Sequence, residues 1–232
     1  YITVGKAVPA GEPVVVIDAG GTNLRIACVV FEPTGEARID RLDTFTMPGI
    51  DEELSKDAFF SQLASYVAPV AGTSEQIGFC FSYPAAISPE RDGKLIRWTK
   101  EIKAPEVEGE FIGKNLLAAL GSKAAGKEIT ILNDTIATLL AGKSAAEDTD
   151  YESYIGFILG TGTNTAYVEK NSNIIKCPGL DPSGSQAINV ESGNFNKSPR
   201  GPVDLQYDQT TQDPGTQAFE KNLVSIYEFI GG

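Results

Sequence analysis

Two glycine-rich segments have residues that could bind phosphate groups. The first, residues 17–23, reads Ile-Asp-Ala-Gly-Gly-Thr-Asn and lies between two apolar runs rich in β-forming residues, so it predicts a hairpin. We expect Gly20 and Gly21 to use backbone angles closed to other residues and to leave room for a ligand beside the main chain. Their N–H groups, together with the Thr22 hydroxyl, could form a nest for an anion.

The carboxylate of Asp18 ends the first strand of this hairpin and could hold Mg²⁺ directly or through water. The alternative is a tight hairpin without a ligand, in which Asp18 and Asn23 only satisfy the turn, because short glycine motifs often match by chance. The first segment alone is compatible with both interpretations.

A near-copy of the first segment occurs at residues 158–164, which read Ile-Leu-Gly-Thr-Gly-Thr-Asn between an apolar run and a β-like run. When Ile17 is aligned with Ile158, Asp18 faces Leu159, so we expect only the first copy to serve a metal. Two phosphate-type hairpins in one chain predict a duplicated domain that holds a polyphosphate from both sides.

Further residues that could do chemistry follow a strand-like run at 128–132. The next residues, 133–135, read Asn-Asp-Thr and begin a helix, which is where α/β sheets place ligand groups. Asp134 could therefore be a general base that takes a proton from an attacking hydroxyl, or merely the N-cap of the helix. Glu191 and Glu220 are additional acidic candidates, and each alone could be a surface charge.

Two other segments combine an aromatic residue with hydrogen-bonding groups. Residues 98–100, Trp-Thr-Lys, offer a rigid ring, a hydroxyl and a cation, although a partly buried Trp and a solvated Lys are the usual case. Residues 82–84, Ser-Tyr-Pro, form a plausible turn at a strand end, and alone they carry no functional signal.

The elements that must position these residues alternate between strand-like and helix-like patterns. Apolar residues at helical spacing, among them Phe59 and Leu63, predict a helix near a possible Ser55 cap. Three strands, then helix, strand, helix, strand and helix describe an RNase-H-like mixed α/β unit, and a second unit starts near Tyr154 without completing its set. Strands are expected within 14–31 and at 39–47, 77–83, 128–132, 154–159 and 166–168, helices at 51–71, around 116–121, at 136–143 and at 216–230, and loops at 176–184 and 198–203.

Composition limits the classes of function. The 232 residues are 41% apolar, enough to build real cores, and their net charge of −12 without a basic cluster argues against nucleic acid and anionic membranes as partners. No apolar run approaches a membrane span, and the absence of histidine excludes triads that use it. Cys28, Cys80 and Cys177 are expected to be reduced, buried thiols of a cytoplasmic protein.

Seven segments, taken together, form an ordered set. They read Ile-Asp-Ala-Gly-Gly-Thr-Asn-Leu-Arg at 17–25, Gly-Phe-Cys-Phe-Ser-Tyr-Pro at 78–84, Arg-Trp-Thr-Lys at 97–100, Asn-Asp-Thr at 133–135, Gly-Thr-Gly-Thr-Asn at 160–164, Ile-Asn-Val-Glu at 188–191, and Pro-Gly through Phe-Glu-Lys at 214–221. In order and spacing they resemble the eukaryotic-type hexokinase family. That family belongs to the actin-like ATPase superfamily, in which two RNase-H-like lobes close over sugar and ATP.

The resemblance implies an α/β protein with mixed sheets and flanking helices, in which residues 1–132 form the small lobe and residues 133–232 begin an incomplete large lobe. It implies ATP-dependent phosphorylation of a hexose at the 6-hydroxyl, with glucose first and mannose or fructose as other candidates. ATP and Mg²⁺ are the implied cofactors, with Asp18 acting on Mg²⁺ through water.

Roles for individual residues also follow from the resemblance. Asp134 would be the base that takes the proton from the sugar hydroxyl, and Lys100 the second catalytic residue. The implied hexose-binding residues are Ser82, Thr99, Lys100, Asn133, Asp134, Asn164, Glu191 and Glu220. The implied phosphate-binding residues are Asp18, Gly20, Gly21, Thr22, Asn23, Arg25, Thr161 and Gly162.

The sequence departs from the family pattern at several points. Residues 191–193 read Glu-Ser-Gly where the family usually has Glu-Trp-Gly, so we expect different packing around that glutamate. Asp18-Ala19 is a mild change from the commoner Asp-Leu. Family members also have an N-terminal helix and continue well beyond this length into the adenosine-binding segment, so we expect the chain to be an incomplete portion of such a protein.

Other functions compete with a hexose kinase. The main alternative is a non-catalytic, hexose-sensing or regulatory protein of the same fold, although a pure sensor needs no base such as Asp134. A zinc-bearing bacterial sugar kinase would need a compact Cys/His site, and an actin-like filament former would lack the sugar motifs. The motifs leave the preferred hexose, the phosphoryl donor and the oligomeric state open.

Overall fold

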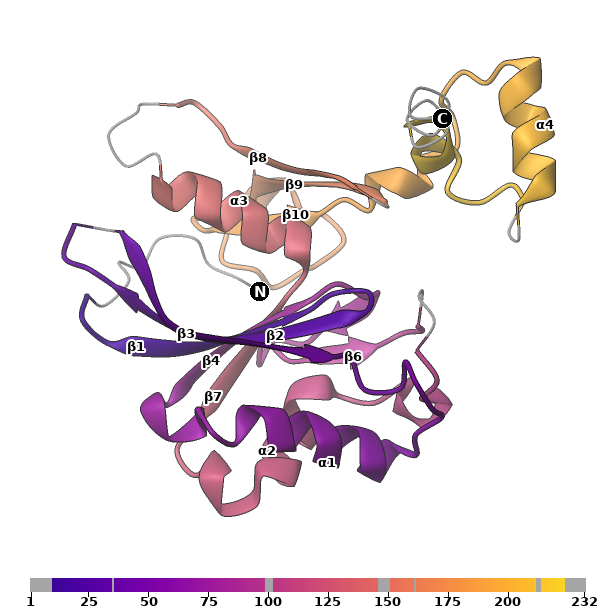
Figure 1. Cartoon of the computed structure of the whole chain (residues 1–232). Helices are drawn as coiled ribbons and strands as arrows, with labels where there is room; N and C mark the ends of the chain where they lie inside the picture. Colours follow the sequence, from indigo (N-terminus) through magenta and orange to yellow (C-terminus); the bar gives the residue numbers. More distant parts are fainter. Residues whose placement is uncertain are drawn as a thin grey trace. The chain divides into compact units, whose positions relative to one another are not determined.

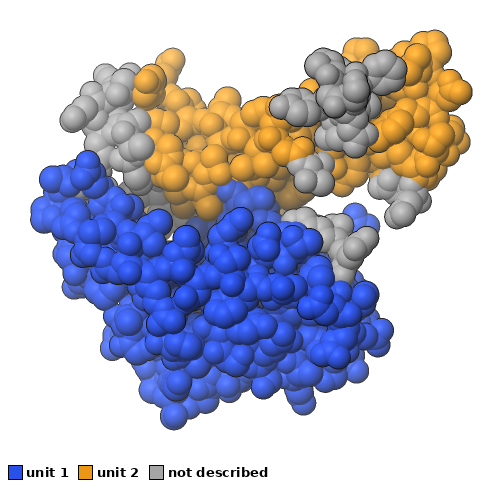
Figure 2. Space-filling view, viewed as in Figure 1, with its two compact units in different colours: residues 1–134 blue, residues 135–232 orange. Residues whose placement is uncertain are grey.

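The computed structural model describes residues 10–34, 36–98, 102–145, 151–160, 162–211 and 214–223 (Figure 1). The chain divides into two compact units, residues 1–134 and residues 135–232, which are coloured blue and orange in Figure 2. That these units are the two lobes expected from the sequence stays a prediction.

Unit 1 contains a five-stranded mixed sheet with the order β3-β2-β1-β4-β7. The first three strands are antiparallel neighbours, and β1, β4 and β7 run parallel to one another. This arrangement is the mixed sheet that the order of elements predicts. The strands are β1 (Pro13–Ala19), β2 (Asn23–Phe31), β3 (Ala37–Thr46), β4 (Gln76–Phe81) and β7 (Glu128–Leu132).

Helices α1 (Lys56–Val67) and α2 (Ile112–Leu120) cover one face of this sheet (Figure 1). Side chains alternate between the faces of a strand, and Ile17, Phe79 and Ile131 in the three parallel strands point into the core with at most 1% of their surface exposed. The even-numbered residues of these strands consequently lie on the opposite face, where the candidate site begins.

Helix α1 is shorter than the predicted helix at 51–71. It begins after Ser55, whose side-chain oxygen accepts a hydrogen bond from the N–H of Ala58 at 3.3 Å, and this confirms the predicted cap. The remaining elements of unit 1 are β5 (Ala85–Ile87), β6 (Gly93–Leu95) and three short 3₁₀ helices, η1 (Ala71–Thr73), η2 (Pro105–Val107) and η3 (Gly121–Ala124).

Unit 2 contains a three-stranded antiparallel sheet with the order β10-β9-β8. Helix α3 (Asp134–Ala145) packs closely on β8 at Gly156. A methyl group on Gly156 would lie 2.7 Å from the carbonyl oxygen of Thr135, so only glycine allows this approach. The strands are β8 (Ile155–Leu159), β9 (Thr163–Lys170) and β10 (Ser185–Asn189), with short helices η4 (Asn171–Asn173) and η5 (Ser192–Asn194).

Helix α4 (Pro202–Thr210) occupies part of the segment 198–203 that the sequence suggests is a loop. Proline is favoured in the first turn of a helix, and the carboxylate of Asp204 accepts a hydrogen bond from the N–H of Gly201 at 2.7 Å. The predicted helix at 216–230 is helical over residues 218–223, and its remainder lies outside the described residues.

The prediction of three buried thiols is wrong for Cys177. This residue is exposed because it lies in a segment of turns before β10, whereas Cys28 is buried and Cys80 is half-buried. In the described part of the chain, no helix has the length and apolar character needed to cross a bilayer.

Candidate functional site

Four of the predicted site residues gather at the carboxyl ends of the parallel strands of unit 1. Asp18 is paired in register with Cys80, and Cys80 with Leu132, so these three residues share the sheet face opposite the helices. Asp134, two residues beyond β7, begins α3. The structure therefore brings Asp18, Ser82, Asn133 and Asp134 to one edge of the sheet.

Cys80 lies between the two acidic members of this group, and sequence reasoning missed it. Burial, followed by the nearby carboxylates of Asp18 and Asp134, raises the pKa of the Cys80 thiol from 9.0 to about 12. The thiol is therefore protonated at neutral pH and can donate a hydrogen bond to Asp18. Its position in the register, directly beside Asp18, is the signal that could have found it.

Arg25 contacts the same carboxylate from the other side. It is the register partner of Asp18 on β2, and its Nη1 donates to Asp18 Oδ2 at 3.0 Å. Both side chains are partly exposed, so the pair is accessible to a ligand that carries negative charge. The pair places a cation and a carboxylate side by side at the base of the first hairpin.

The first glycine hairpin is closed by the N–H of Gly20, which donates to the carbonyl oxygen of Asn23 at 3.0 Å. The expectation of an unusual backbone angle is wrong for Gly20, whose φ is not positive. The absence of a side chain matters there in another way, since a methyl group would make a close contact of 3.3 Å with the carbonyl oxygen of Asn23. The first hairpin is thus closed by a short backbone hydrogen bond and not by a left-handed conformation at Gly20.

The segment 82–84, which by sequence carries no functional signal, fastens this hairpin to β4. The N–H of Ser82 donates to the carbonyl oxygen of Ala19 at 3.2 Å, and the Tyr83 hydroxyl donates to the carbonyl oxygen of Gly20 at 2.6 Å. Burial raises the pKa of the Tyr83 phenol, so the hydroxyl stays protonated and acts as a donor. The ring packs edge-on against Trp98, with centroids 4.8 Å apart.

The second hairpin, in unit 2, is held by Glu220. Oε2 of Glu220 accepts a hydrogen bond from the N–H of Thr163 at 2.8 Å. A methyl group on Gly162 would lie 2.7 Å from that oxygen, and one on Gly193 would lie 2.9 Å from it. Two glycines from different segments therefore allow one carboxylate to approach the main chain closely.

The two hairpins have similar sequences but different strand registers. Ile17 pairs with Ile26, whereas the aligned residue Ile158 pairs with Asn164. In the alignment Asn164 corresponds to Asn23. The partner of Ile158 is therefore three positions earlier in its hairpin than the partner of Ile17, Ile26, is in the first. The copies are alike in composition and not in hydrogen bonding.

Two predicted hexose-binding residues of unit 2 are connected through Asn189, which sequence reasoning did not select. The amide of Asn164 donates to Asn189 Oδ1 at 2.6 Å, and the amide of Asn189 donates to Glu191 Oε1 at 2.7 Å. Asn189 belongs to the motif 188–191, and its position two residues before Glu191 places the two side chains together. The structure thus gathers Asn164 and Glu191 in one polar network.

Glu191 has a left-handed backbone conformation, with φ 55° and ψ 46°. This conformation is uncommon for a residue with a side chain, and such residues cluster at functional sites. In the part of unit 2 that the structure describes, the buried hydroxyl of the next residue, Ser192, has no hydrogen-bond partner. Both features lie in the segment 191–193, where the sequence departs from the pattern that it otherwise resembles.

The residues present fit a water-mediated magnesium ion at Asp18. Among the described residues there is no group of three or more Cys, Asp and Glu side chains that could enclose a metal. Magnesium usually keeps several waters and binds through one or two carboxylates and substrate phosphates, so a single accessible carboxylate suffices. Thr99, Lys100 and Thr161, which are also predicted site residues, lie outside the described residues.

Comparison with known families matches residues 4–144 to a family described as hexokinase, and residues 154–227 to a second family with the same description. Hexokinase-1 of Spinacia oleracea is 35% identical over 228 residues, which cover 91% of this chain and 45% of that protein. Hexokinase-1 of Schizosaccharomyces pombe is 32% identical over 226 residues, which cover 91% of this chain and 46% of that protein. The chain spans about half the length of these relatives.

Solved structures show the same fold. A hexokinase from Schistosoma mansoni in complex with glucose superposes with a TM-score of 0.71 at 28% identity, covering 90% of this chain and 48% of that one. A second hexokinase crystal structure gives a TM-score of 0.73 at 26% identity, covering 92% of this chain and 50% of that one.

Proposed function

Since this chain belongs to the hexokinase family, we propose that the protein phosphorylates a hexose, glucose first, at the 6-hydroxyl with ATP as the donor. The observation that carries the proposal is the position of Asp134. It comes two residues after the end of β7 and lies at the same sheet edge as Asp18 and Ser82, where parallel sheets bind ligands.

Asp134 is the proposed general base. Its carboxylate accepts the proton of the sugar hydroxyl as that oxygen attacks the terminal phosphate, and Lys100 is the proposed second catalytic residue. A hydroxyl is a weak nucleophile at neutral pH, so a carboxylate in hydrogen-bond reach makes the attack easier.

The proposed sugar site is a set of polar side chains that match the many hydroxyls of a hexose. A site built to pair hydroxyls rejects analogues that lack one, because its own buried groups are then left unpaired. Asn164 and Glu191 are already joined through Asn189, which orients them for such pairing. The proposed hexose-binding residues are Ser82, Thr99, Lys100, Asn133, Asp134, Asn164, Glu191 and Glu220.

The proposed phosphate site uses the two hairpins. Gly20, Gly21, Thr22, Asn23 and Arg25 would contact phosphate groups from the first hairpin, and Thr161 and Gly162 from the second. Asp18 would hold Mg²⁺ through water, and when bound this ion neutralises charge on the transferred phosphoryl group.

The test is a comparison of the full-length wild-type protein with Asp134→Asn. We expect hexose 6-phosphate formation to fall by about 10²- to 10⁴-fold in kcat, while the hexose dissociation constant measured by calorimetry changes by less than about threefold. Asp57→Asn, the same change at an exposed residue in the first turn of α1, is the control and should keep wild-type kcat.

Two results would contradict the proposal. An Asp134→Asn variant with wild-type kcat would remove Asp134 as the base. A wild-type protein that binds glucose in the presence of Mg-ATP and forms no hexose 6-phosphate would favour the hexose sensor.

A further inference from the structure

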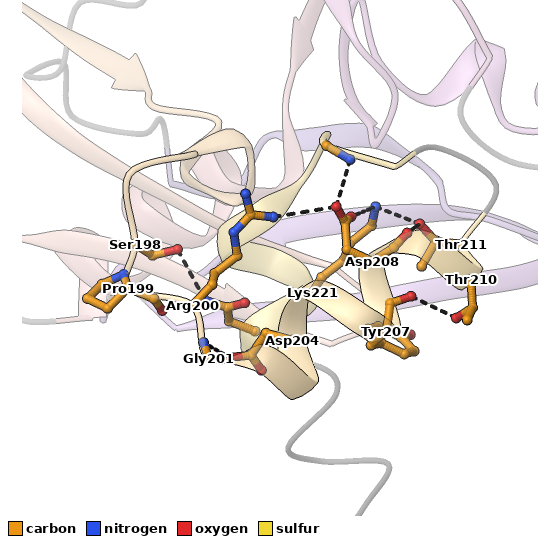
Figure 3. Close-up of polar contacts among 12 residues, drawn as sticks. Ser198, Pro199, Arg200, Gly201, Asp204, Tyr207, Asp208, Thr210, Thr211 and Lys221 are labelled. Carbon is orange, nitrogen blue, oxygen red and sulfur yellow. Dashed lines mark hydrogen bonds and ion pairs between the residues drawn. The ribbon is translucent and has the colours of Figure 1, made fainter.

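Asp208 in α4 is a buried carboxylate that the proposed reaction does not use (Figure 3). Only 6% of its side chain is exposed, and both of its oxygens have partners. Oδ1 accepts from the ammonium of Lys221 at 2.8 Å, and Oδ2 accepts from the N–H of Gly215 at 2.9 Å and lies 3.5 Å from Nη1 of Arg200. The hydrogen bond from Lys221 is the main cause that lowers the pKa of Asp208, so the carboxylate is ionised at neutral pH.

Lys221 is equally well fixed. Besides Asp208, its ammonium donates to Oγ1 of Thr211 at 2.8 Å, and 13% of its side chain is exposed (Figure 3). A buried ion pair is weak evidence for net stability, because the cost of removing two charges from water offsets their attraction. What the pair does provide is a fixed position for residue 221 relative to α4.

Lys221 is adjacent in sequence to Glu220, on the helical turn at 218–223. The N–H of Lys221 donates to the carbonyl oxygen of Gln217 at 2.9 Å, so the two neighbours belong to one hydrogen-bonded helical turn. This turn therefore has two anchors on consecutive residues: Lys221 joins it to Asp208, and Glu220 joins it to the N–H of Thr163.

The carboxylate of Glu220 lies close to the main chain of two glycines. Its Oε2 atom lies where a methyl group on Gly162 or on Gly193 would collide with it. A rotation of the 218–223 turn that carries this carboxylate away would therefore lengthen its hydrogen bond from the N–H of Thr163.

We propose that Asp208 is a positioning residue for the hexose and phosphate sites. By holding Lys221 it fixes the turn on which Glu220 is carried, and thereby sets the carboxylate that binds the second hairpin and the hexose. The hexose part of this inference rests on the proposed function, whereas the hairpin part rests on the contacts within unit 2 alone.

The experiment is a double-mutant cycle in the full-length protein, with Asp208→Asn and Glu220→Gln alone and together. We expect Asp208→Asn to raise the hexose dissociation constant about tenfold in the wild-type background, and less than about twofold in the Glu220→Gln background. A merely structural role would give the same factor in both backgrounds.

Asp204→Asn is the matched control, because it makes the same change on the same helix. Asp204 caps the start of α4 through Gly201, whereas the described hydrogen bonds of the Lys221 ammonium go to Asp208 and Thr211. We expect this control to lower the melting temperature and to change the hexose dissociation constant less than about twofold. Lys221→Arg, which keeps the positive charge, should retain most of the hexose affinity.

Amide hydrogen exchange tests the inference without hexose. We expect Asp208→Asn to speed exchange of the Thr163 amide at least about fivefold, and Asp204→Asn to leave it unchanged. Additive losses in the cycle, equal effects of the two Asp→Asn variants, or an unchanged Thr163 amide in Asp208→Asn would each overturn the inference. If the wild-type protein binds no hexose, the proposed function fails, and the exchange experiment still decides the role of Asp208.

Discussion

Tyr83 donates its hydroxyl to the carbonyl oxygen of Gly20 at 2.6 Å, and the same hydroxyl lies 3.3 Å from the carbonyl oxygen of Gly21. The phenol thus connects the end of β4 to the first glycine hairpin. Because the ring also packs against Trp98 and Phe81, the aromatic core behind the sheet edge supports the main chain that is proposed to bind phosphate.

Removal of this hydroxyl should weaken nucleotide binding more than hexose binding. In Tyr83→Phe the ring remains, but the carbonyl oxygens of Gly20 and Gly21 lose their donor, so we expect the KM for ATP to rise about threefold to tenfold. The free energy of unfolding should fall by about 1 kcal/mol in chemical denaturation.

Tyr66→Phe is the control for this prediction. The Tyr66 hydroxyl accepts from the amide of Gln62 at 2.7 Å within α1, so its loss should cost similar stability and leave the KM for ATP unchanged. An equal rise of KM in both variants would show that Tyr83 has no specific effect on the hairpin.

A methyl group on Gly162 should displace the carboxylate of Glu220. The added carbon would lie 2.7 Å from Oε2, which must move and give up its hydrogen bond from the N–H of Thr163, so we expect Gly162→Ala to lower the free energy of unfolding by about 1 kcal/mol. Gly142→Ala, on the exposed side of α3 where a methyl group meets nothing within 4 Å, should raise it by about 0.5–1 kcal/mol. Denaturant unfolding of the two variants measures both free energies. A destabilised Gly142→Ala variant, or a Gly162→Ala variant as stable as the wild type, would contradict this prediction.

The three cysteines should differ in their reactivity. Cys177 is exposed, whereas Cys80 is half-buried with a pKa of about 12, so alkylation with iodoacetamide at pH 8 should modify Cys177 first. Mass spectrometry of the digested protein measures the order. Modification of Cys80 at the rate of Cys177 in the folded protein would contradict the surroundings described for Cys80.

Cys80 should also make stability depend on alkaline pH. Its pKa is raised from 9.0 to about 12, so above pH 9 the unfolded chain loses this proton while the folded chain keeps it, and stability falls as pH rises. We expect Cys80→Ser to lose less free energy of unfolding between pH 8 and pH 11 than the wild type. Cys177→Ser, at the exposed position, should follow the wild-type curve, and identical curves for all three proteins would contradict the assignment.

The sheet of unit 1 could be predicted because its strands carry strong apolar patterns. Strand 128–132 has the predicted bounds, and the polar residues that follow it lie at the expected sheet edge. Helix α4 could not be predicted in the same way, because Val203 and Leu205 are exposed and the buried member of this helix is the charged Asp208. Because the buried contacts of α4 are ion pairs of Asp208, its sequence lacks the apolar stripe from which a helix is usually predicted.

The sequence selects candidate site residues, but it does not show which residues support them. The motifs select Asp18, Asn164 and Glu220 by type and spacing, but the supporting roles of Asn189 and Tyr83 depend on contacts across segments that are distant in sequence. Such contacts follow from strand pairing and close approach, which a pattern along the chain does not encode.

The unequal registers of the two hairpins limit how the internal repeat can be used. An odd offset in pairing reverses which side chains share a face with a given partner. If residues 17–23 were exchanged with residues 158–164, similar sequences would therefore be placed between strands whose hydrogen-bond registers differ. The flanking strands set the backbone pairing of each loop, so similarity in sequence does not make the two loops interchangeable.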